Sequence, residues 1–181
     1  MSTHPNPSTT CKKSDVKCWT WSDSSHLLAS KARSRVEGNH FLGNIPDVEN
    51  TLEDQRTFVN SPFCIEASIL NSVVGEFSEA EVAAACANAR QGVPHSIDLM
   101  ELDHPQHQTP QELDNYVARG IPNNTLMPKW SKEIDMRYFW LKERENQKQF
   151  KLHWEKCINS LADYFTKYYP KEHHCNMIFF V

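Results

Sequence analysis

The fold of this chain is decided by the stretch KCWTWSDSSHLLASKARSR, which runs from Lys17 to Arg35. Aromatic and polar residues alternate over residues 16–21, and this period of two predicts a half-buried β-strand. The alternation stops at Asp23, and small hydroxyl residues follow. A carboxylate at the end of a strand has two interpretations. It starts a turn, as Ser/Asp clusters often do, or a rigid strand end holds it as a metal ligand.

The elements that follow predict a mixed sheet. Further strands are predicted at 36–42, at 63–74, just before Asp114, and at 150–156; helices are predicted from Ser78, after Asp114, from Ser131 and from Ser160. Three consecutive strands favour an antiparallel meander, and the later alternation of strand and helix favours parallel additions. The fold class is therefore α/β, a mixed sheet flanked by helices.

The helix from Ser78 has the clearest pattern. Ser78 and Glu81 have the S-x-x-E spacing of a capping box, and Val82, Cys86 and Ala89 follow the spacing of one buried helical face. The Gly-Val-Pro sequence at 92–94 predicts a break in this helix, and HSIDLMEL (residues 95–102) is expected to resume it before His104. In the helix from Ser131, three residues form a second buried stripe: Ile134, Tyr138 and Leu141.

Length and charge limit the function. A chain of 181 residues suggests one domain, and its net charge of -4 argues against a surface that grips nucleic acid everywhere. Basic and aromatic residues are nevertheless interleaved over 129–156. We expect this region to contact a phosphate backbone; the alternative is an ordinary solvated helix and strand. The predicted nucleic-acid-binding residues are Lys129, Lys132, Arg137 and Lys142.

The sequence favours an intracellular protein that is neither secreted nor membrane-bound. Residues 1–15 form a polar leader that we expect to be disordered, with no apolar segment typical of a signal peptide. No apolar run has the length of a membrane span. The six cysteines contain no CxxC pair, which favours reduced thiols. A zinc site at His173, His174 and Cys175 is a weaker alternative, because adjacent ligands give poor chelate geometry.

Four acids lie where a predicted element begins or ends: Asp23, Glu81, Asp114 and Asp163. If the first and fourth strands are neighbours, these carboxylates converge. Clustered carboxylates repel and their pKa values rise, so a cation has to neutralise them. Oxygen ligands favour Mg²⁺ or Mn²⁺, and two such ions can support phosphodiester cleavage. Each acid also has a simpler interpretation: a turn residue, a capping-box partner, a helix cap and a dipole partner, respectively.

Six blocks of the sequence carry a family resemblance: WSDSSHLLASKARSR, HFLGN, SEAEVAAACANAR, LDNYVARGI, PKWSKEIDMRYFWLKERE and NSLADYFTKYYPKEHH. In this order they resemble the ribonuclease H (RNase H) domain that closes the reverse transcriptase of copia-type LTR retrotransposons. The resemblance implies an RNase H-like five-stranded mixed sheet over residues 16–170, with 171–181 as a tail of uncertain structure. It also implies cleavage of the RNA strand of RNA–DNA hybrids with two Mg²⁺ (or Mn²⁺) ions.

The same resemblance assigns catalytic and metal-binding roles to Asp23, Glu81, Asp114 and Asp163, and an origin in a larger Pol polyprotein. Glu81 is preferred to Glu79 because it directly precedes the core-facing Val82. Residues 47–61 and the apolar C-terminal residues depart from the family pattern. They leave open an alternative, a catalytically inactive relic or domesticated nucleic-acid-binding module with the same fold.

Overall fold

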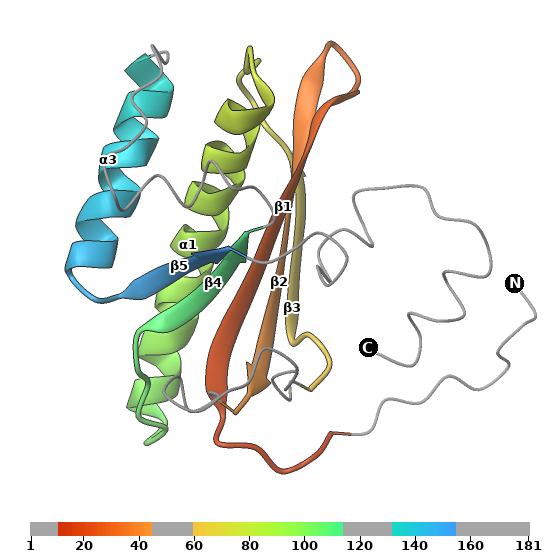
Figure 1. Ribbon diagram of the computed structural model, residues 1–181. Helices are drawn as coiled ribbons and strands as arrows, with labels where there is room; N and C mark the ends of the chain where they lie inside the picture. The colour runs from red at the N-terminus through yellow and green to blue at the C-terminus, as the bar shows by residue number, and fades with distance from the viewer. Residues whose placement is uncertain (1–10, 45–59, 114–131, 155–181) are drawn as a thin grey trace, which may run out of the picture.

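The computed structural model describes residues 11–44, 60–113 and 132–154 of the chain (Figure 1). In chain order the elements are β1 (Lys17–Ala29), β2 (Arg33–Gly43), β3 (Cys64–Ile69), α1 (Phe77–Glu101), β4 (Thr109–Leu113), α3 (Lys132–Asn146) and β5 (Phe150–Trp154). The predicted sequence of three strands, helix, strand, helix and strand is confirmed. The leader, the predicted helices after Asp114 and from Ser160, and the C-terminal tail lie outside the described residues.

The five strands form one sheet in the order β3-β2-β1-β4-β5. β1 pairs antiparallel with β2, and β2 antiparallel with β3, whereas β4 lies parallel to β1 and β5 parallel to β4. The mixed sheet is therefore confirmed, as is the condition that the first and fourth strands are neighbours. Both helices lie on one side of the sheet in Figure 1, where α1 packs against β1, β2 and β4, and α3 packs against α1 and β5.

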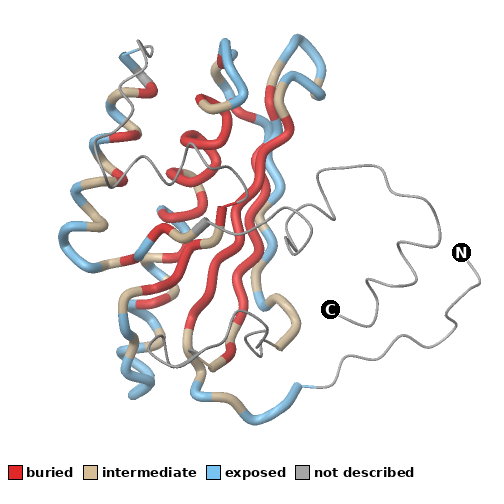
Figure 2. The backbone as a smooth tube through the Cα atoms, in the orientation of Figure 1, coloured by how far each residue is buried: buried red, intermediate tan, exposed pale blue. Residues whose placement is uncertain are grey.

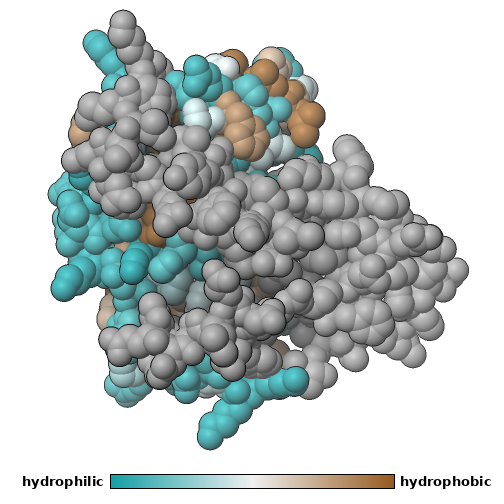
Figure 3. Space-filling view, viewed as in Figure 1, coloured by the Kyte–Doolittle hydropathy of each residue, from teal (hydrophilic) through white to brown (hydrophobic). Residues whose placement is uncertain are grey.

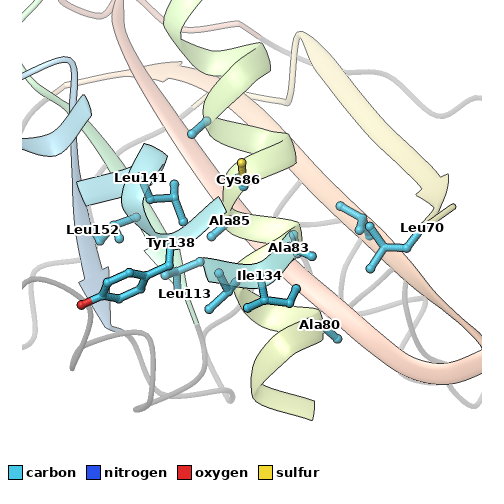
Figure 4. Packing of buried hydrophobic residues seen from close by; sticks show 14 of the residues in the cluster. Leu70, Ala80, Ala83, Ala85, Cys86, Leu113, Ile134, Tyr138, Leu141 and Leu152 are labelled. Carbon is cyan, nitrogen blue, oxygen red and sulfur yellow. The ribbon is translucent and has the colours of Figure 1, made fainter. Parts of the chain in front are cut away.

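The main core lies between this face of the sheet and the helices (Figure 4). The predicted stripe of α3 is confirmed: Ile134, Tyr138 and Leu141 are all buried. They meet α1 and the side chains of Leu113 and Leu152 from the two parallel strands. Full burial of a leucine side chain contributes roughly 1.5–3 kcal/mol relative to an exposed one. Figure 2 shows this burial concentrated on the central strands and on the inner side of the helices.

The contact between α1 and the central strands is close and polar. Asn88 of α1 is fully buried, and its Nδ2 donates to Ser22 Oγ and to the Glu37 carbonyl oxygen, both at 2.7 Å. A Cβ atom on Gly38 would lie only 1.9 Å from Asn88 Oδ1. Gln111 Nε2 of β4 donates to the carbonyl oxygen of Ala85 at 2.8 Å. These bonds tie the helix to three strands at a separation that only small residues permit.

The predicted end of the first strand is wrong. β1 does not stop near Trp21 but continues through Asp23 to Ala29, paired with β2 up to a register shift between Ser25 and Ala29. The polar residues after Trp21 remain in the strand because α1 buries and hydrogen-bonds them. The hairpin then closes through Lys31 and Ala32, whose positive φ values of 63° and 52° are typical of tight hairpin turns.

The predicted N-cap and the predicted break of the first helix are also wrong, whereas the helical residues expected after the break are confirmed. The N-cap is Glu76, the cap forms no side-chain hydrogen bond, and Ser78 lies inside α1, so the predicted capping box does not form. The helix also continues past the 92–94 segment to Glu101, with Pro94 inside it. The predicted buried face, which includes Val82 and Cys86, is confirmed. Within the described part of the chain, neither helix is long and apolar enough to cross a membrane.

Candidate active site

Three elements meet where β4 ends. The last rung of the parallel ladder between β1 and β4 joins Ser22 to Leu113. Asp23 follows Ser22 in β1, and Asp114 follows Leu113 in the sequence, although Asp114 itself lies outside the described residues. Beyond this rung no described residue of β4 pairs with β1. Among the described residues, the β4 side of β1 is therefore unpaired at Asp23, the first predicted acid.

Helix α1 brings Glu81 to this position. Ser24 Oγ donates a hydrogen bond of 2.5 Å to Glu81 Oε1, and both residues are buried. That length is typical of a hydroxyl bonded to a carboxylate. The other acid of the first helical turn, Glu79, accepts a 2.8 Å bond from the backbone nitrogen of Gly75 instead. Glu81 is thus joined to β1 by a buried hydrogen bond.

The alternation of side chains along β1 places Asp23 and Glu81 on different faces of the sheet. Neighbouring side chains of a strand point to opposite faces, so Asp23 leaves β1 on the face opposite Ser24. Trp19 and Trp21 share the Asp23 side of the strand, and they pack against Phe41 in a separate aromatic cluster. Asp23 and Glu81 therefore approach the end of the β1–β4 ladder from opposite faces of the sheet.

A third acid that the sequence had not singled out lies across from Asp23. Asp23 and Glu37 are direct cross-strand partners in the antiparallel ladder, and both are buried, at 1% and 3% exposure. Carboxylates directly opposed in a ladder repel each other when both are charged. The sequence signal was a lone glutamate inside the predicted strand 36–42. One such residue does not show which neighbour it faces.

The donor atoms fit a hard divalent ion, but the described residues do not complete a site. Carboxylate and hydroxyl oxygens are the ligands that Mg²⁺ prefers. Within residues 11–44, 60–113 and 132–154, no three His, Cys, Asp or Glu side chains form a group able to hold a metal ion. Asp114 and Asp163, the other two predicted ligands, lie outside these ranges, as do the residues of the alternative zinc site, His173, His174 and Cys175.

The predicted nucleic-acid-binding residues do not form one stripe. Lys129 lies outside the described residues, whereas Lys132, Arg137 and Lys142 are all on α3. These residues are spaced five apart in the sequence. At about 100° per residue, each side chain therefore lies about 140° around the helix from the previous one. Lys132 is exposed and Lys142 is half-buried. Arg137 is half-buried too, and its Nη2 donates to Ser72 Oγ at 3.5 Å.

Comparisons with known proteins support the fold. No family model matches the sequence, and no curated protein matches it. LC11-RNase H1, isolated from compost by a metagenomic approach, matches with a TM-score of 0.54 and 10% identity over 82% of this chain and 91% of that chain. The same enzyme in complex with an RNA/DNA hybrid matches with a TM-score of 0.50 and 8% identity, over 81% and 91%.

A viral protein also resembles the chain. The protease–reverse transcriptase of prototype foamy virus matches 91% of this chain and 21% of that one, with 12% identity and a TM-score of 0.47. That score is too low to bear on the origin of the chain. The two matches to LC11-RNase H1 establish an RNase H-like fold, as the resemblance implied. At identities of 8–10% they establish the fold and not the activity.

Proposed function

We propose that this chain is a retrotransposon-derived ribonuclease H that hydrolyses the RNA strand of RNA–DNA hybrids. The observation that carries the proposal is the arrangement at the end of β4, where Glu81 contacts Ser24 next to Asp23. The RNase H-like fold supports it, since one matched structure of that fold holds an RNA/DNA hybrid. The six copia-like sequence blocks support an origin in a Pol polyprotein. A hybrid substrate implies an intracellular site of action.

In this proposal Asp23, Glu81, Asp114 and Asp163 bind two Mg²⁺ ions, or Mn²⁺ in their place. Bound ions would activate water and stabilise the leaving oxygen of the cleaved phosphodiester. The chain contributes rigid placement: β1 fixes Asp23 by pairing on the β2 side, and Ser24 fixes the carboxylate of Glu81. Fixed ligands reduce the reorganisation that the reaction requires. Of the predicted nucleic-acid-binding residues, the exposed Lys132 of α3, together with Lys129, would contact the hybrid backbone.

One observation bears on the alternative, an inactive module with the same fold. Glu37 is buried directly opposite Asp23. An extra carboxylate at this place either adds a ligand or competes with the arrangement that cleavage needs. The two possibilities differ in activity, so an assay on purified protein separates them.

The test is cleavage of a labelled RNA–DNA hybrid by the full chain in MgCl₂, with RNA duplex and DNA duplex as controls. We expect cleavage of the hybrid alone, with a loss of at least about 100-fold in Asp23→Asn and in Glu81→Gln, because each removes a charged ligand. Glu79→Gln is the matched control, since it removes the same charge from the same helical turn and Glu79 accepts a hydrogen bond from Gly75. Its rate should stay close to that of the unmodified chain.

Two results would decide against the proposal. A folded chain that binds hybrid without cutting it would identify the inactive module. Cleavage that proceeds equally in Asp23→Asn would show that the residues assigned here do not catalyse it.

A further inference from the structure

Two arginines from different helices stack on one tryptophan. The guanidinium carbon of Arg90, on α1, lies 5.3 Å from the ring centroid of Trp140, on α3. The guanidinium carbon of Arg144, one helical turn after Trp140, lies 5.5 Å from the same centroid. Trp140 is in turn stacked on Phe150 of β5, with centroids 6.5 Å apart. The packing of α1 against α3, visible in Figure 1, therefore places two positive charges around one anchored ring.

The nearby acids do not neutralise these charges. Arg144 Nη1 donates to a neutral partner, Gln147 Oε1, at 3.2 Å. Glu143 Oε1 accepts from Gln147 Nε2, and Glu145 Oε1 accepts from the backbone nitrogen of Leu152. Within the described residues, no carboxylate forms an ion pair with Arg144 or with Arg90, which is exposed. The two guanidinium groups are thus held against one ring, Arg90 exposed and Arg144 half-buried, without a carboxylate partner among the described residues.

We propose that Arg90, Trp140 and Arg144 form a binding site for the phosphate backbone of a nucleic acid. The planar guanidinium group matches phosphate geometry and stacks on aromatic faces, so a ring-bound arginine presents its donors at little entropic cost. Cation–π contact alone contributes about 0.5–1 kcal/mol at an exposed site. This contact holds the arginine side chains in place but does not neutralise their charge, so an anion can still bind to them.

The proposed site is separate from the carboxylates and extends the footprint of the nucleic acid. Arg90 follows Glu81 by nine residues of the same helix, which corresponds to about 14 Å along its axis. This inference rests on the proposed function for the identity of the ligand, an RNA–DNA hybrid. The geometry of the arginine site does not depend on cleavage. Neither arginine forms a hydrogen bond to Asp23 or Glu81 that the structure describes.

The test measures binding of a fluorescent RNA–DNA hybrid to the full chain in EDTA, which prevents metal-dependent cleavage, over a range of salt concentrations. The double variant Arg90→Gln/Arg144→Gln should bind about 10-fold more weakly at 0.1 M salt. Its plot of log affinity against log salt should be shallower by roughly 1 to 2, the amount expected from the loss of two phosphate contacts. Arg90→Lys/Arg144→Lys should recover part of the affinity.

The matched control is Lys13→Gln/Lys31→Gln, which removes the same charge from two exposed positions outside residues 129–156. An equal loss in this control would show a general charge effect and overturn the site. So would a glutamine double variant that binds normally and only melts at a lower temperature, since the arginines would then serve α1–α3 packing alone. Loss of cleavage in Asp23→Asn with binding unchanged would leave this site standing and bear only on the proposed activity.

Discussion

At the scale of single residues, the hydroxyl of Ser24 stabilises a buried carboxylate by a hydrogen bond. It donates to a carboxylate, Glu81, that is only 1% exposed. Removing the donor leaves that carboxylate buried with one hydrogen bond fewer, and bonds to charged groups contribute about 1.5–3 kcal/mol. We expect Ser24→Ala to lower the free energy of unfolding by about this amount in urea denaturation. It should also weaken Mg²⁺ binding in calorimetry.

Ser30→Ala provides the matched control for this prediction, because Ser30 is exposed in the same hairpin. Its unfolding free energy should stay within about 0.5 kcal/mol of the original. Equal stability of the two serine variants would mean that the Ser24–Glu81 bond contributes nothing to the fold.

His40 makes stability depend on pH. Its ring is fully buried, its Nδ1 lies 3.0 Å from Thr20 Oγ1, and His95 packs edge-on at 5.2 Å. Burial, with a smaller contribution from the charge of His95, lowers the pKa of His40 to about 4 from its usual 6.5. The unfolded chain therefore takes up a proton at His40 at a higher pH than the folded chain does. This stability is present above pH 6.5 and is lost as the pH falls toward 4.

The pKa difference predicts a loss of roughly 3 kcal/mol from His40 between pH 6.5 and pH 4. Urea unfolding curves across this range measure it. His40→Gln, which has no titrating ring, should flatten the dependence, although its stability at pH 7 will also be lower. His104→Gln is the control at an exposed histidine. If His40→Gln keeps the full slope, other groups cause the acid sensitivity.

At the scale of elements, the closest helix–sheet contact is between Asn88 of α1 and Gly38 of β2. A Cβ at Gly38 would overlap the Asn88 side chain, which bonds to both Ser22 and the Glu37 carbonyl. We expect Gly38→Ala to cost at least about 2 kcal/mol of unfolding free energy, because either the helix shifts or buried hydrogen bonds break. Thermal melting followed by circular dichroism measures this loss.

Gly75→Ala is the comparison for this experiment, since a Cβ at Gly75 would have only Glu79 Oε2 nearby, at 3.6 Å. It should melt close to the original temperature. Combining Gly38→Ala with Asn88→Ala should cost less than the sum of the two single changes, as expected for residues in contact. Strict additivity would show that the two do not compete for the same space.

The element scale also shows what the sequence could predict. Periodicity located five strands and the buried faces of both helices, because those depend on local spacing. It misplaced the end of β1, since the partner that buries Ser24 lies 57 residues away in α1. It predicted a break in α1 at 92–94, where the helix is continuous and Gly92 lets it approach Thr20 and His40 closely. Local signals do not register contacts made by distant segments.

The residues of the candidate site also fall into two groups, those that the sequence identified and those that it missed. Glu81 was identifiable because a recognisable motif surrounds it, and the structure places it against β1. Glu37 was missed, because its importance comes from the β1–β2 register that sets it opposite Asp23. Arg90 was missed as part of a basic site because α1–α3 packing alone brings it to Trp140. Such pairings become visible only when the tertiary arrangement is known.

At the scale of the whole molecule, the strand order places β3 at one edge of the sheet. Within the described residues β3 pairs with β2 alone and forms an edge of the sheet. Ile65 and Ile69 of this strand are 47% and 42% exposed. A second exposed apolar surface is visible at the top of Figure 3, at the end of the molecule where the β1–β2 hairpin turns, and Leu28 and Val73 are also exposed. The molecule therefore offers two surfaces through which it could associate.

Chains would associate by strand pairing at the β3 edge but by apolar contact at the second surface. This difference allows the role of the edge to be tested. An exposed strand edge offers unpaired backbone groups to another chain, and charged side chains, lysine above all, block such pairing. We expect Ile65→Lys/Ile69→Lys to raise the temperature at which light scattering first increases, with little change in the melting temperature. Leu28→Lys/Val73→Lys adds the same charge and removes as many exposed apolar residues, but away from β3. If this control protects equally well, association depends on hydrophobicity or net charge rather than on strand pairing; if only the β3 variant protects, the edge is where chains join.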